Sequence, residues 1–482
     1  MPRENYELVI GLEVHCQLQT VSKMFSDCTF EFGAEPNLHI DPYTLALPGS
    51  LPVPNAQAVD FAVKLALALG CEIQMESRWA RKHYFYPDLP KGYQITQAEL
   101  PYARGGSLLI PVKGAGEVAR RIALTRIHME EDAGKNIHLA GENRSLLDFN
   151  RAGAPLVEVV SEAEIRSAKE AANYLRELRS IIRCLKISEA NMEEGSLRCD
   201  ANVSLRRLGA TTLGTRCEIK NLNSFKHLES AIEAECRRQV DLLDAGEEVV
   251  QGTMAYDVEQ DRTWMMRSKE SAADYRYLPE PDLPPLQLEA SRVDALRQSL
   301  PELPQARMTR YLAAGLGNKD AEVLSADLGL ADYFEGVLCD SLPIQLVCNW
   351  VRGELLAQLH RDGKEVATSP LAPQALQELL CLIETGTLSN TSAKYVFKRM
   401  YHEEVSAREL VRQENLQQIV DPDELARLVQ ESFARYPQQC AQLRAGKTKL
   451  RGFFFGKCME ESRRRADPKL LNQQLDLQLI ST

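Results

Sequence analysis

Alternating polar and apolar positions run through much of the first 290 residues and predict a sheet. In residues 8–18 and 196–206 every second side chain is polar and its neighbours are apolar. Residues 216–221 repeat this pattern after a loop that ends at Gly214, so they predict an antiparallel hairpin with residues 196–206. The polar face of this hairpin is densely charged, which favours a surface that faces a ligand, with a solvated face as the alternative.

Helical spacing of apolar residues appears at three places in the same region. Helices are expected over residues 56–70, 167–184 and 224–245. Asn55 is the expected N-cap of the first helix. Ser167 with Glu170 three residues later predicts a capping box for the second.

From about residue 291 the strand patterns all but vanish and helical patterns with short breaks replace them. A proline cluster at residues 279–285 marks the change. We therefore expect an α+β protein with a sheet-rich, largely antiparallel domain, an all-α helical domain and a small helical tail domain. Their expected bounds are residues 1–290, 291–388 and 389–482.

Three consecutive carboxylates, Glu130, Glu131 and Asp132, end the strand predicted over residues 123–131. Strand alternation places Glu131 on the apolar, core-directed face and Glu130 on the same side as His128. A carboxylate directed inward is costly unless it meets a metal, a cation or several donors. Glu131 is therefore a candidate site residue, and a solvated strand end is an equally weighted alternative.

Two further strands carry polar groups that fit a site. Glu13 and His15 are two positions apart on residues 8–18 and so project side by side, a pair suited to a metal or phosphate, although a wet outer face is the simpler explanation. Glu158 lies within an apolar run, where an isolated carboxylate needs a partner. A metal site is the expected partner.

Length, charge and cysteine usage limit the class of protein. A chain of 482 residues exceeds what one hydrophobic core usually serves. No apolar run has the length of a membrane span, and no signal segment precedes the first strand, which predicts a cytoplasmic protein without membrane partners. Twelve cysteines without a Cys-x-x-Cys pair argue against structural zinc and against a disulfide framework.

Several familiar catalytic motifs are missing from the sequence. It has no Walker-type phosphate loop, no dinucleotide-binding glycine motif and no Gly-x-Ser-x-Gly elbow. Any nucleotide site is therefore atypical. The chain is equipped for metal-assisted chemistry on a carboxylate or phosphate, and no nucleophile for covalent acyl catalysis stands out.

A basic segment near the end of the chain contrasts with a net charge of −11 for the whole protein. Residues 440–470 contain nine Lys and Arg against three Asp and Glu, a local charge of +6. A charge run is usually a solvated helix face, but beside three phenylalanines at 453–455 an RNA-backbone contact is the better interpretation. The candidate tRNA-binding residues are Lys447, Lys449, Arg451, Lys457, Arg463, Arg464 and Arg465.

Taken together, long irregular motifs resemble the B subunits of the aspartyl/glutamyl-tRNA(Asn/Gln) amidotransferases, and the resemblance extends from end to end of the chain. Residues 27–30 and 38–43 depart from the family pattern. The matching segments are residues 9–15, 32–37, 81–94, 128–135, 150–155, 191–204, 218–225 and 274–277, with Ala445–Lys447 and Gly452 to Gly456 in the tail.

This resemblance implies a cradle-shaped catalytic domain and a tail that grips tRNA. It also implies a reaction in which ATP and Mg²⁺ phosphorylate the side-chain carboxylate of misacylated Glu-tRNA(Gln) or Asp-tRNA(Asn). Ammonia then displaces the phosphate to form the amide. The implied partners are the amidase (A) subunit, which supplies ammonia from glutamine through a tunnel, and the small (C) subunit.

Carried onto this sequence, the family's metal site falls on His15, Glu131 and Glu158, with Glu13 as a further ligand. Replacing Glu131 by glutamine is therefore expected to abolish amide formation. Charge and position suggest further residues that contact the phosphates of ATP or the acyl phosphate, namely Lys82, Arg151, Arg198 and Lys220.

Two other classes of function remain alternatives. A non-catalytic subunit that presents tRNA is disfavoured by the inward carboxylates, which such a protein does not need. A free-standing ATP-dependent ligase for a small carboxylic acid is disfavoured by the basic helical tail.

Overall fold

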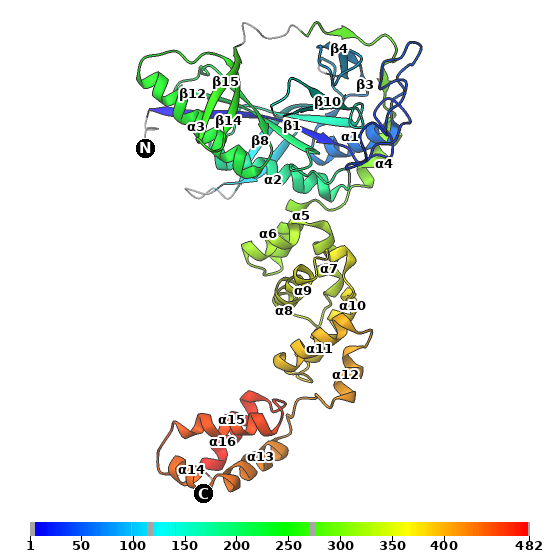
Figure 1. Cartoon of the computed structure of the whole chain (residues 1–482). Coiled ribbons are helices and arrows are strands. Elements are labelled where there is room, and N and C mark those ends of the chain that lie inside the picture. The colour runs from blue at the N-terminus through cyan, green and yellow to red at the C-terminus, as the bar shows by residue number, and fades with distance from the viewer. Residues whose placement is uncertain (1–4, 98, 113–118, 140, 269–274, 481–482) are drawn as a thin grey trace. The chain divides into compact units, whose positions relative to one another are not determined.

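The computed structural model describes residues 5–97, 99–112, 119–139, 141–268 and 275–480 (Figure 1). The chain forms two compact units, Met1–Pro304 and Gln305–Thr482, and each is described here by itself. Asp274, the first residue of the motif at 274–277, lies outside the described residues. The expected α+β class is confirmed, because the described strands belong to the first unit and the second is helical.

A ten-stranded sheet organises the first unit, in the order β15-β14-β13-β12-β1-β11-β8-β6-β2, with β7 paired to β8 outside this path. Its described pairs are antiparallel except β13 with β14, so the largely antiparallel prediction is confirmed. The strands are β1 (Tyr6–Gln17), β2 (Glu72–Ile73), β6 (Ala103–Arg104), β7 (Ser107–Pro111), β8 (Ala119–Glu131), β11 (Pro155–Ser161), β12 (Leu197–Arg207), β13 (Cys217–Leu222), β14 (Gly252–Asp257) and β15 (Arg262–Ser268).

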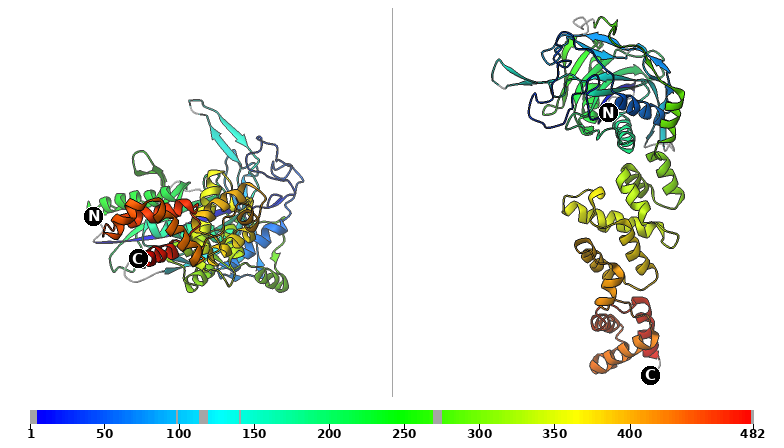
Figure 2. Two further views of the ribbon diagram at one scale, coloured as in Figure 1. Left: turned by 90° about the horizontal axis from the view of Figure 1, so that it is seen from below. Right: turned by 90° about the vertical axis from the view of Figure 1, so that its right-hand side faces the viewer.

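Three small sheets border this one. They pair β3 (Glu76–Ser77) with β17 (Leu286–Gln287), β4 (Ala80–His83) with both β5 (Tyr93–Thr96) and β16 (Leu278–Pro279), and β9 (Lys135–His138) with β10 (Ser145–Asp148). Figure 2 shows the β9–β10 hairpin extending away from the rest of the first unit.

The predicted helices of this unit are present with the predicted caps. They are α1 (Ala56–Ala68), α2 (Ala168–Cys184) and α3 (Phe225–Asp244), followed by α4 (Ala290–Gln298). The Asn55 side chain accepts hydrogen bonds from two backbone amides of α1. Ser167 Oγ accepts from Glu170 N at 3.2 Å, but the Glu170 carboxylate accepts from Arg166 N, so the predicted capping box forms on one side only.

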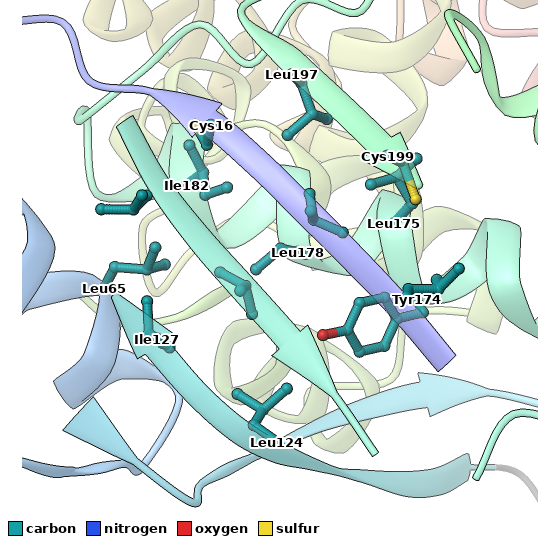
Figure 3. Close-up of a cluster of buried hydrophobic side chains, with 14 of the residues drawn as sticks. Cys16, Leu65, Leu124, Ile127, Tyr174, Leu175, Leu178, Ile182, Leu197 and Cys199 are labelled. Carbon is teal, nitrogen blue, oxygen red and sulfur yellow. The ribbon is translucent and has the colours of Figure 1, made fainter. Parts of the chain in front are cut away.

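One face of the ten-stranded sheet carries the core of the first unit. Side chains of β1, β8 and β12 point toward α2 in Figure 3, with Leu65 of α1 beside them. Cys16, Ile127 and Leu178 are each fully buried there. Each buried leucine of this kind contributes roughly 1.5–3 kcal/mol, which fixes the strand register and leaves the polar positions on the opposite face.

A β-bulge in β8 interrupts its alternation. The pairing with β11 passes from Val160 opposite Arg126 to Ser161 opposite Leu124, which leaves one extra residue on β8. Leu124 is therefore buried in the core together with Ile127, whereas simple alternation placed it on the side of Arg126. Simple alternation fails at Leu124 because a bulge shifts the period by one residue.

The second unit consists of helices around two hydrophobic cores. Its elements are α5 (Pro304–Ala313), α6 (Asn318–Ala326), α7 (Leu328–Val337), α8 (Ile344–Asn349), the π-helix Trp350–Leu355, α9 (Leu356–Arg361), the 3₁₀ helix Val366–Thr368, α10 (Pro373–Glu384), α11 (Asn390–His402), α12 (Ala407–Gln413), α13 (Pro422–Arg435), α14 (Pro437–Arg444), α15 (Leu450–Glu461) and α16 (Pro468–Ile480).

Three hydrophobic cores are formed by the described residues, one in the first unit and two in the second. Val293 of α4 is buried in the core of the first unit, beyond the expected end at residue 290. One core of the second unit extends from Tyr311 to Val411, across residues 388 and 389, and the other from Leu425 to Leu475. Among the described helices, none combines the length and apolarity of a membrane span.

Candidate active site

A row of polar side chains crosses the face of the sheet opposite the core. His15 of β1 lies opposite Glu158 of β11, and Glu158 lies opposite His128 of β8. Glu158 Oε2 is 3.3 Å from His15 Nε2 and 3.2 Å from His128 Nε2. Cross-strand pairing thus brings three residues that are distant in the sequence into direct contact.

Glu130 joins this row from the end of β8. Its carboxylate lies 4.0 Å from His15 Nε2 and 3.3 Å from His128 Nε2. Thr96 Oγ1 donates to Glu130 Oε1 at 2.7 Å, and Gln94 Nε2 donates to Oε2 at 3.1 Å. One ligand atom each from His15, Glu130 and Glu158 lie within 4.8 Å of one another, a spacing suited to a single metal ion.

Glu131 is not part of this cluster, and its predicted place beside His15 and Glu158 is corrected. Its buried carboxylate points to the other face of β8, where Lys91 Nζ donates to it in an ion pair and Ile95 N donates at 3.1 Å. Lys91 also donates to the Tyr43 hydroxyl at 2.7 Å. Strand alternation correctly placed Glu131 on the core-directed face of β8. The cation that this buried carboxylate needs is Lys91, which lies on that face.

Electrostatics within the cluster are dominated by its carboxylates. Burial alone raises the pKa of Glu158, but His128 and His15 hold it well below its usual range. Burial alone lowers the pKa of His128, but the charges and hydrogen bonds of Glu158 and Glu130 raise it to about 9. The charges of these two carboxylates thus favour the protonated form of His128 in the metal-free protein, and a bound metal would take over that role.

The residues fit a divalent cation. Two buried carboxylates and an imidazole converge, and the donors Thr96 and Gln94 hold Glu130 in place. His128 Nδ1 is buried without a hydrogen-bond partner among the described residues. Carboxylates completed by water and substrate oxygens suit Mg²⁺, and the imidazole also suits transition metals.

Glu13 lines the cavity above the cluster but is not one of its three converging residues. Its Oε1 accepts a hydrogen bond from Asn202 Nδ2 at 2.9 Å. Burial and the nearby charge of Glu158 raise the pKa of the Glu13 carboxyl. The structure therefore places Glu13 in the wall of the cavity, close to the cluster.

Lys82 and Lys220 line the cavity of about 370 Å³ that contains the cluster. Both also line an adjoining cavity of about 690 Å³. Lys82 Nζ lies 5.1 Å from the centre of the Tyr275 ring, and Lys220 Nζ lies 3.0 Å from Asp200 and 2.8 Å from Glu218. Predicted cations and predicted carboxylates thus share one cavity system.

Arg151 and Arg198 line the adjoining cavity and are held by Asp132, a residue whose role the sequence left open. Asp132 Oδ2 accepts from Arg198 Nη2 at 2.7 Å and lies 3.7 Å from Arg151 Nε. Gln17 Nε2 donates to the same oxygen at 2.7 Å. Burial would raise the pKa of Asp132, but Arg198 and Arg151 lower it. The carboxylate orients the Arg198 guanidinium directly, whereas Arg151 donates to the carbonyl oxygens of Ala133 and Gly134.

His128 and Glu130 were missed as site residues although strand parity had grouped them together. The sequence signal was available, because both residues alternate with the core residues Ile127 and Met129. Both therefore occupy the polar face of the predicted strand. Asp132, in contrast, could not be assigned, because its partners come from distant strands.

The basic tail residues lie on α15 and in the connections that join it to α14 and α16. Arg451 forms an ion pair with Asp476, and Lys457 one with Glu460. Arg465 donates to the Asn415 carbonyl, whereas four other candidates are exposed. These exposed residues are Lys447, Lys449, Arg463 and Arg464.

The phenylalanines at 453–455 do not form an exposed stacking surface. Phe454 is fully buried in the second core of this unit, and Phe453 and Phe455 pack against that core. Their aromatic rings therefore stabilise the helices that carry the basic residues.

Comparisons with known proteins match residues in both compact units. The GatB/GatE catalytic domain matches residues 8–294, and the GatB domain matches residues 332–479. A relative from Thermosynechococcus vestitus is 48% identical over 478 residues, covering 98% of this chain and 96% of the relative. One from Solidesulfovibrio magneticus is 47% identical over 475 residues, covering 98% and 99%.

Both relatives are named as the B subunit of an aspartyl/glutamyl-tRNA(Asn/Gln) amidotransferase. A third relative of that name, from Prosthecochloris aestuarii, is 48% identical over 476 residues, or 98% of each chain. The matches run through both compact units, including the strands that carry His15, Glu130 and Glu158. This chain belongs to the family of aspartyl/glutamyl-tRNA(Asn/Gln) amidotransferase B subunits.

Proposed function

We propose that this chain uses ATP and Mg²⁺ to convert misacylated Glu-tRNA(Gln), Asp-tRNA(Asn) or both into the amidated aminoacyl-tRNA. The observation that carries this proposal is the cluster of His15, Glu130 and Glu158 on the floor of a cavity lined by lysines. Phosphoryl transfer needs such an arrangement, because catalysis depends on positioning and on neutralising the charge of the phosphates.

Two bond exchanges make up the proposed reaction. A side-chain carboxylate oxygen of the aminoacyl group attacks the γ-phosphorus of ATP, and the bond from that phosphorus to the oxygen of ADP breaks. The nitrogen of ammonia then attacks the acyl carbon, and phosphate leaves with the oxygen through which it was bound. Ammonia comes from glutamine hydrolysed by a partner protein, which agrees with the lack of a nucleophile motif in this sequence.

The proposed metal ligands are His15, Glu130 and Glu158, with Glu13 as a further candidate. Bound Mg²⁺ would neutralise negative charge on the phosphates. Glu130 thus replaces Glu131 in the set that the family resemblance first implied. Thr96 and Gln94 would keep the Glu130 carboxylate oriented in the absence of substrate.

Lys82 and Lys220 are placed to meet negative charge that develops on the transferred phosphoryl group. Burial lowers the pKa of Lys82, but the nearby Glu130 charge raises it overall, so the ammonium form is favoured. Arg151 and Arg198, held by Asp132, are proposed to contact the aminoacyl end of the tRNA in the adjoining cavity.

The basic tail is proposed to contact the tRNA backbone through its exposed residues Lys447, Lys449, Arg463 and Arg464. The proposed protein partners are the amidase (A) subunit and the small (C) subunit. An assembled complex of the three proteins is the form in which the activity should be measured.

The test is to incubate that complex with misacylated tRNA, ATP, Mg²⁺ and ammonium, and to measure ADP and amidated aminoacyl-tRNA. We expect both products, and we expect Glu158→Gln to abolish both. Amide formation that survives Glu158→Gln would place the chemistry elsewhere and give this chain the role of presenting tRNA. ADP formed with a free amino acid and no tRNA would indicate a small-molecule ligase.

A further inference from the structure

Two cysteines of the second unit lie beside one hydroxyl group. Cys339 follows α7 in the connection to α8, and Cys381 lies on α10. Ser341 Oγ is 3.2 Å from Cys339 Sγ and 3.9 Å from Cys381 Sγ. One side chain thus contacts both sulfur atoms, which places the two thiols close together.

The packing of α7 against α10 holds this pair in place (Figure 1). Gln377 Nε2 of α10 donates to the carbonyl oxygens of Val337 and Leu338 at 3.1 and 3.2 Å. Cys381 is four residues after Gln377, so the two side chains are neighbours on one face of α10. The face that holds the end of α7 therefore also presents the Cys381 thiol to the segment that follows.

Two backbone features bring Cys339 to that face. A Cβ at Gly336 in α7 would lie 3.0 Å from the Cβ of Pro373, so the glycine permits the close approach of α7 to the start of α10. Leu342 N donates to the Cys339 carbonyl oxygen at 3.0 Å, which closes the chain after α7 into a turn. Cys339 is therefore held by a turn and a helix contact.

The chemistry of these thiols differs from that of the buried cysteines. Both are partly exposed, whereas Cys16 and Cys71 are buried, and burial raises the pKa of each to about 12. Hydrogen bonds from Ser341, and the Cys381 thiol, lower the pKa of Cys339 against the effect of burial. Burial and the charge of Cys339 raise the pKa of Cys381. Cys339 thus has the larger thiolate fraction, and the thiolate is the form that attacks oxidants.

A metal site is the other use of paired thiols. Among the described residues, no His, Asp, Glu or further Cys joins Cys339 and Cys381 as a third ligand. Structural zinc takes four such ligands. The pair therefore fits thiol–disulfide chemistry better than metal binding.

We propose that Cys339 and Cys381 form a reversible disulfide when the protein meets a hydroperoxide. The Cys339 thiolate attacks one peroxide oxygen, the O–O bond breaks, and the departing oxygen takes up a proton to leave as water or an alcohol. The peroxide gains two electrons and the Cys339 sulfur loses them, which gives a sulfenic acid.

Cys381 completes the reaction. Its sulfur attacks the Cys339 sulfur, the S–O bond breaks, and the hydroxide leaves as water with the proton of the Cys381 thiol. An added dithiol returns both residues to thiols by exchange.

The bond would join the connection between α7 and α8 covalently to α10. Disulfides that form transiently inside cells usually serve redox sensing, in contrast to the permanent bridges of secreted proteins. This inference goes beyond the proposed function and does not depend on it, because the oxidation needs neither tRNA nor a nucleotide.

The test treats the full-length chain with hydrogen peroxide, alkylates the remaining thiols and identifies the digested peptides by mass spectrometry. We expect a pair of peptides joined through Cys339 and Cys381, which dithiothreitol separates. Cys28 is the matched control, because it is also partly exposed but burial raises its pKa. Cys28 should be oxidised about 10-fold more slowly than Cys339.

Two variants test the order of the steps. Cys381→Ser removes the second thiol, so the sulfenic acid at Cys339 should persist and be trapped by dimedone. Cys339→Ser should leave Cys381 reduced at the same dose of peroxide. Thermal unfolding of both variants checks that the fold is kept.

Three results would overturn the proposal. Cys339 and Cys381 that are both still alkylated after peroxide treatment would be inert packing residues. Oxidation of Cys28 as fast as that of Cys339 would mean that the surroundings of the pair confer no reactivity. A sulfenic acid on Cys381 in Cys339→Ser would overturn the assigned order. The peptides of the unmodified chain decide the first two points even where a variant loses its fold.

Discussion

Glu130 and Glu131 are consecutive and equally buried, yet they lie in opposite electrostatic surroundings. Glu131 is matched with a single lysine, Lys91, on the core side of β8. Glu130 lies on the cavity side, where Glu13, Glu158 and Asp200 add further negative charge. Burial alone therefore does not identify an active-site carboxylate. The convergence of its ligand atoms with those of His15 and Glu158 does, because such a set can share one metal ion.

The largest expected effect is a loss of enzymatic activity that distinguishes Glu130 from Glu131. Glu130→Gln should lower amide formation about 10³-fold, since it removes a proposed metal ligand and several kcal/mol of transition-state stabilisation. Folding should be retained, because glutamine can still accept from Thr96. Steady-state transamidation by the assembled complex is the measurement, with the melting temperature as the control. Full activity in Glu130→Gln would show that the reaction does not depend on the cavity-side glutamate, contrary to the comparison drawn above.

The second prediction concerns stability on the core side. Glu131→Gln leaves the Lys91 ammonium buried without its partner, so we expect a loss of about 3–5 kcal/mol in the free energy of unfolding. A double variant, Lys91→Met with Glu131→Gln, should recover part of that loss. Denaturant unfolding of the chain measures the free energy of unfolding of both variants. A Glu131→Gln protein that is stable but inactive would instead give Glu131 a role in the reaction.

A smaller, pH-dependent effect is expected from the cavity side. Glu158 and Glu130 raise the pKa of His128 from an ordinary value near 6.5 to about 9, despite burial. A raised folded-state pKa stabilises the protein fully below about pH 6.5, and the stabilisation is lost as pH rises through about 9. In metal-free protein the free energy of unfolding should fall by up to roughly 3 kcal/mol over this range.

His128→Gln should flatten this dependence, whereas Lys91→Met should leave it in place. Denaturant midpoints measured in EDTA between these pH values provide the comparison. The same slope in His128→Gln would assign the titration to another group.

The smallest effect compares exposed with paired cations in the tail. Arg463→Ser with Arg464→Ser should weaken tRNA binding and reduce the slope of log affinity against log salt by about 1.5–2, if each contacts one phosphate. Arg451→Gln should change that slope less, because Arg451 is already paired with Asp476. Filter binding at several salt concentrations distinguishes them, and an unchanged slope in the double variant contradicts the proposed RNA contact.

Strand periodicity predicted much of the fold and part of the site. The polar faces of β1 and β12 and the three helices with their caps follow from local pattern, since their side chains obey simple periods. His15 and Glu158 were found because polar residues stand out among apolar neighbours. The family resemblance, not periodicity, brought these two into one site.

What the sequence could not show depends on contacts between distant segments. Lys91 lies 40 residues before Glu131 and next to β5, which belongs to another sheet, so neither the ion pair nor the reason for burying Glu131 is visible locally. The β8 bulge is set by its pairing with β11, so alternation along the sequence does not reveal that Leu124 lies in the core. Asp132 acquires its role from Arg151 and Arg198, which only the assembled sheet brings near.

The central position of β1 has a consequence for synthesis of the chain. This strand emerges first, but its two neighbours, β11 and β12, are translated much later, and β12 ends only at Arg207. Pairing between segments so far apart in the sequence is slow, because the chain must lose the conformational entropy of loop closure before stabilising contacts form. A strand with one apolar face therefore waits without partners on the ribosome, and slow pairing of this kind exposes the nascent chain to aggregation.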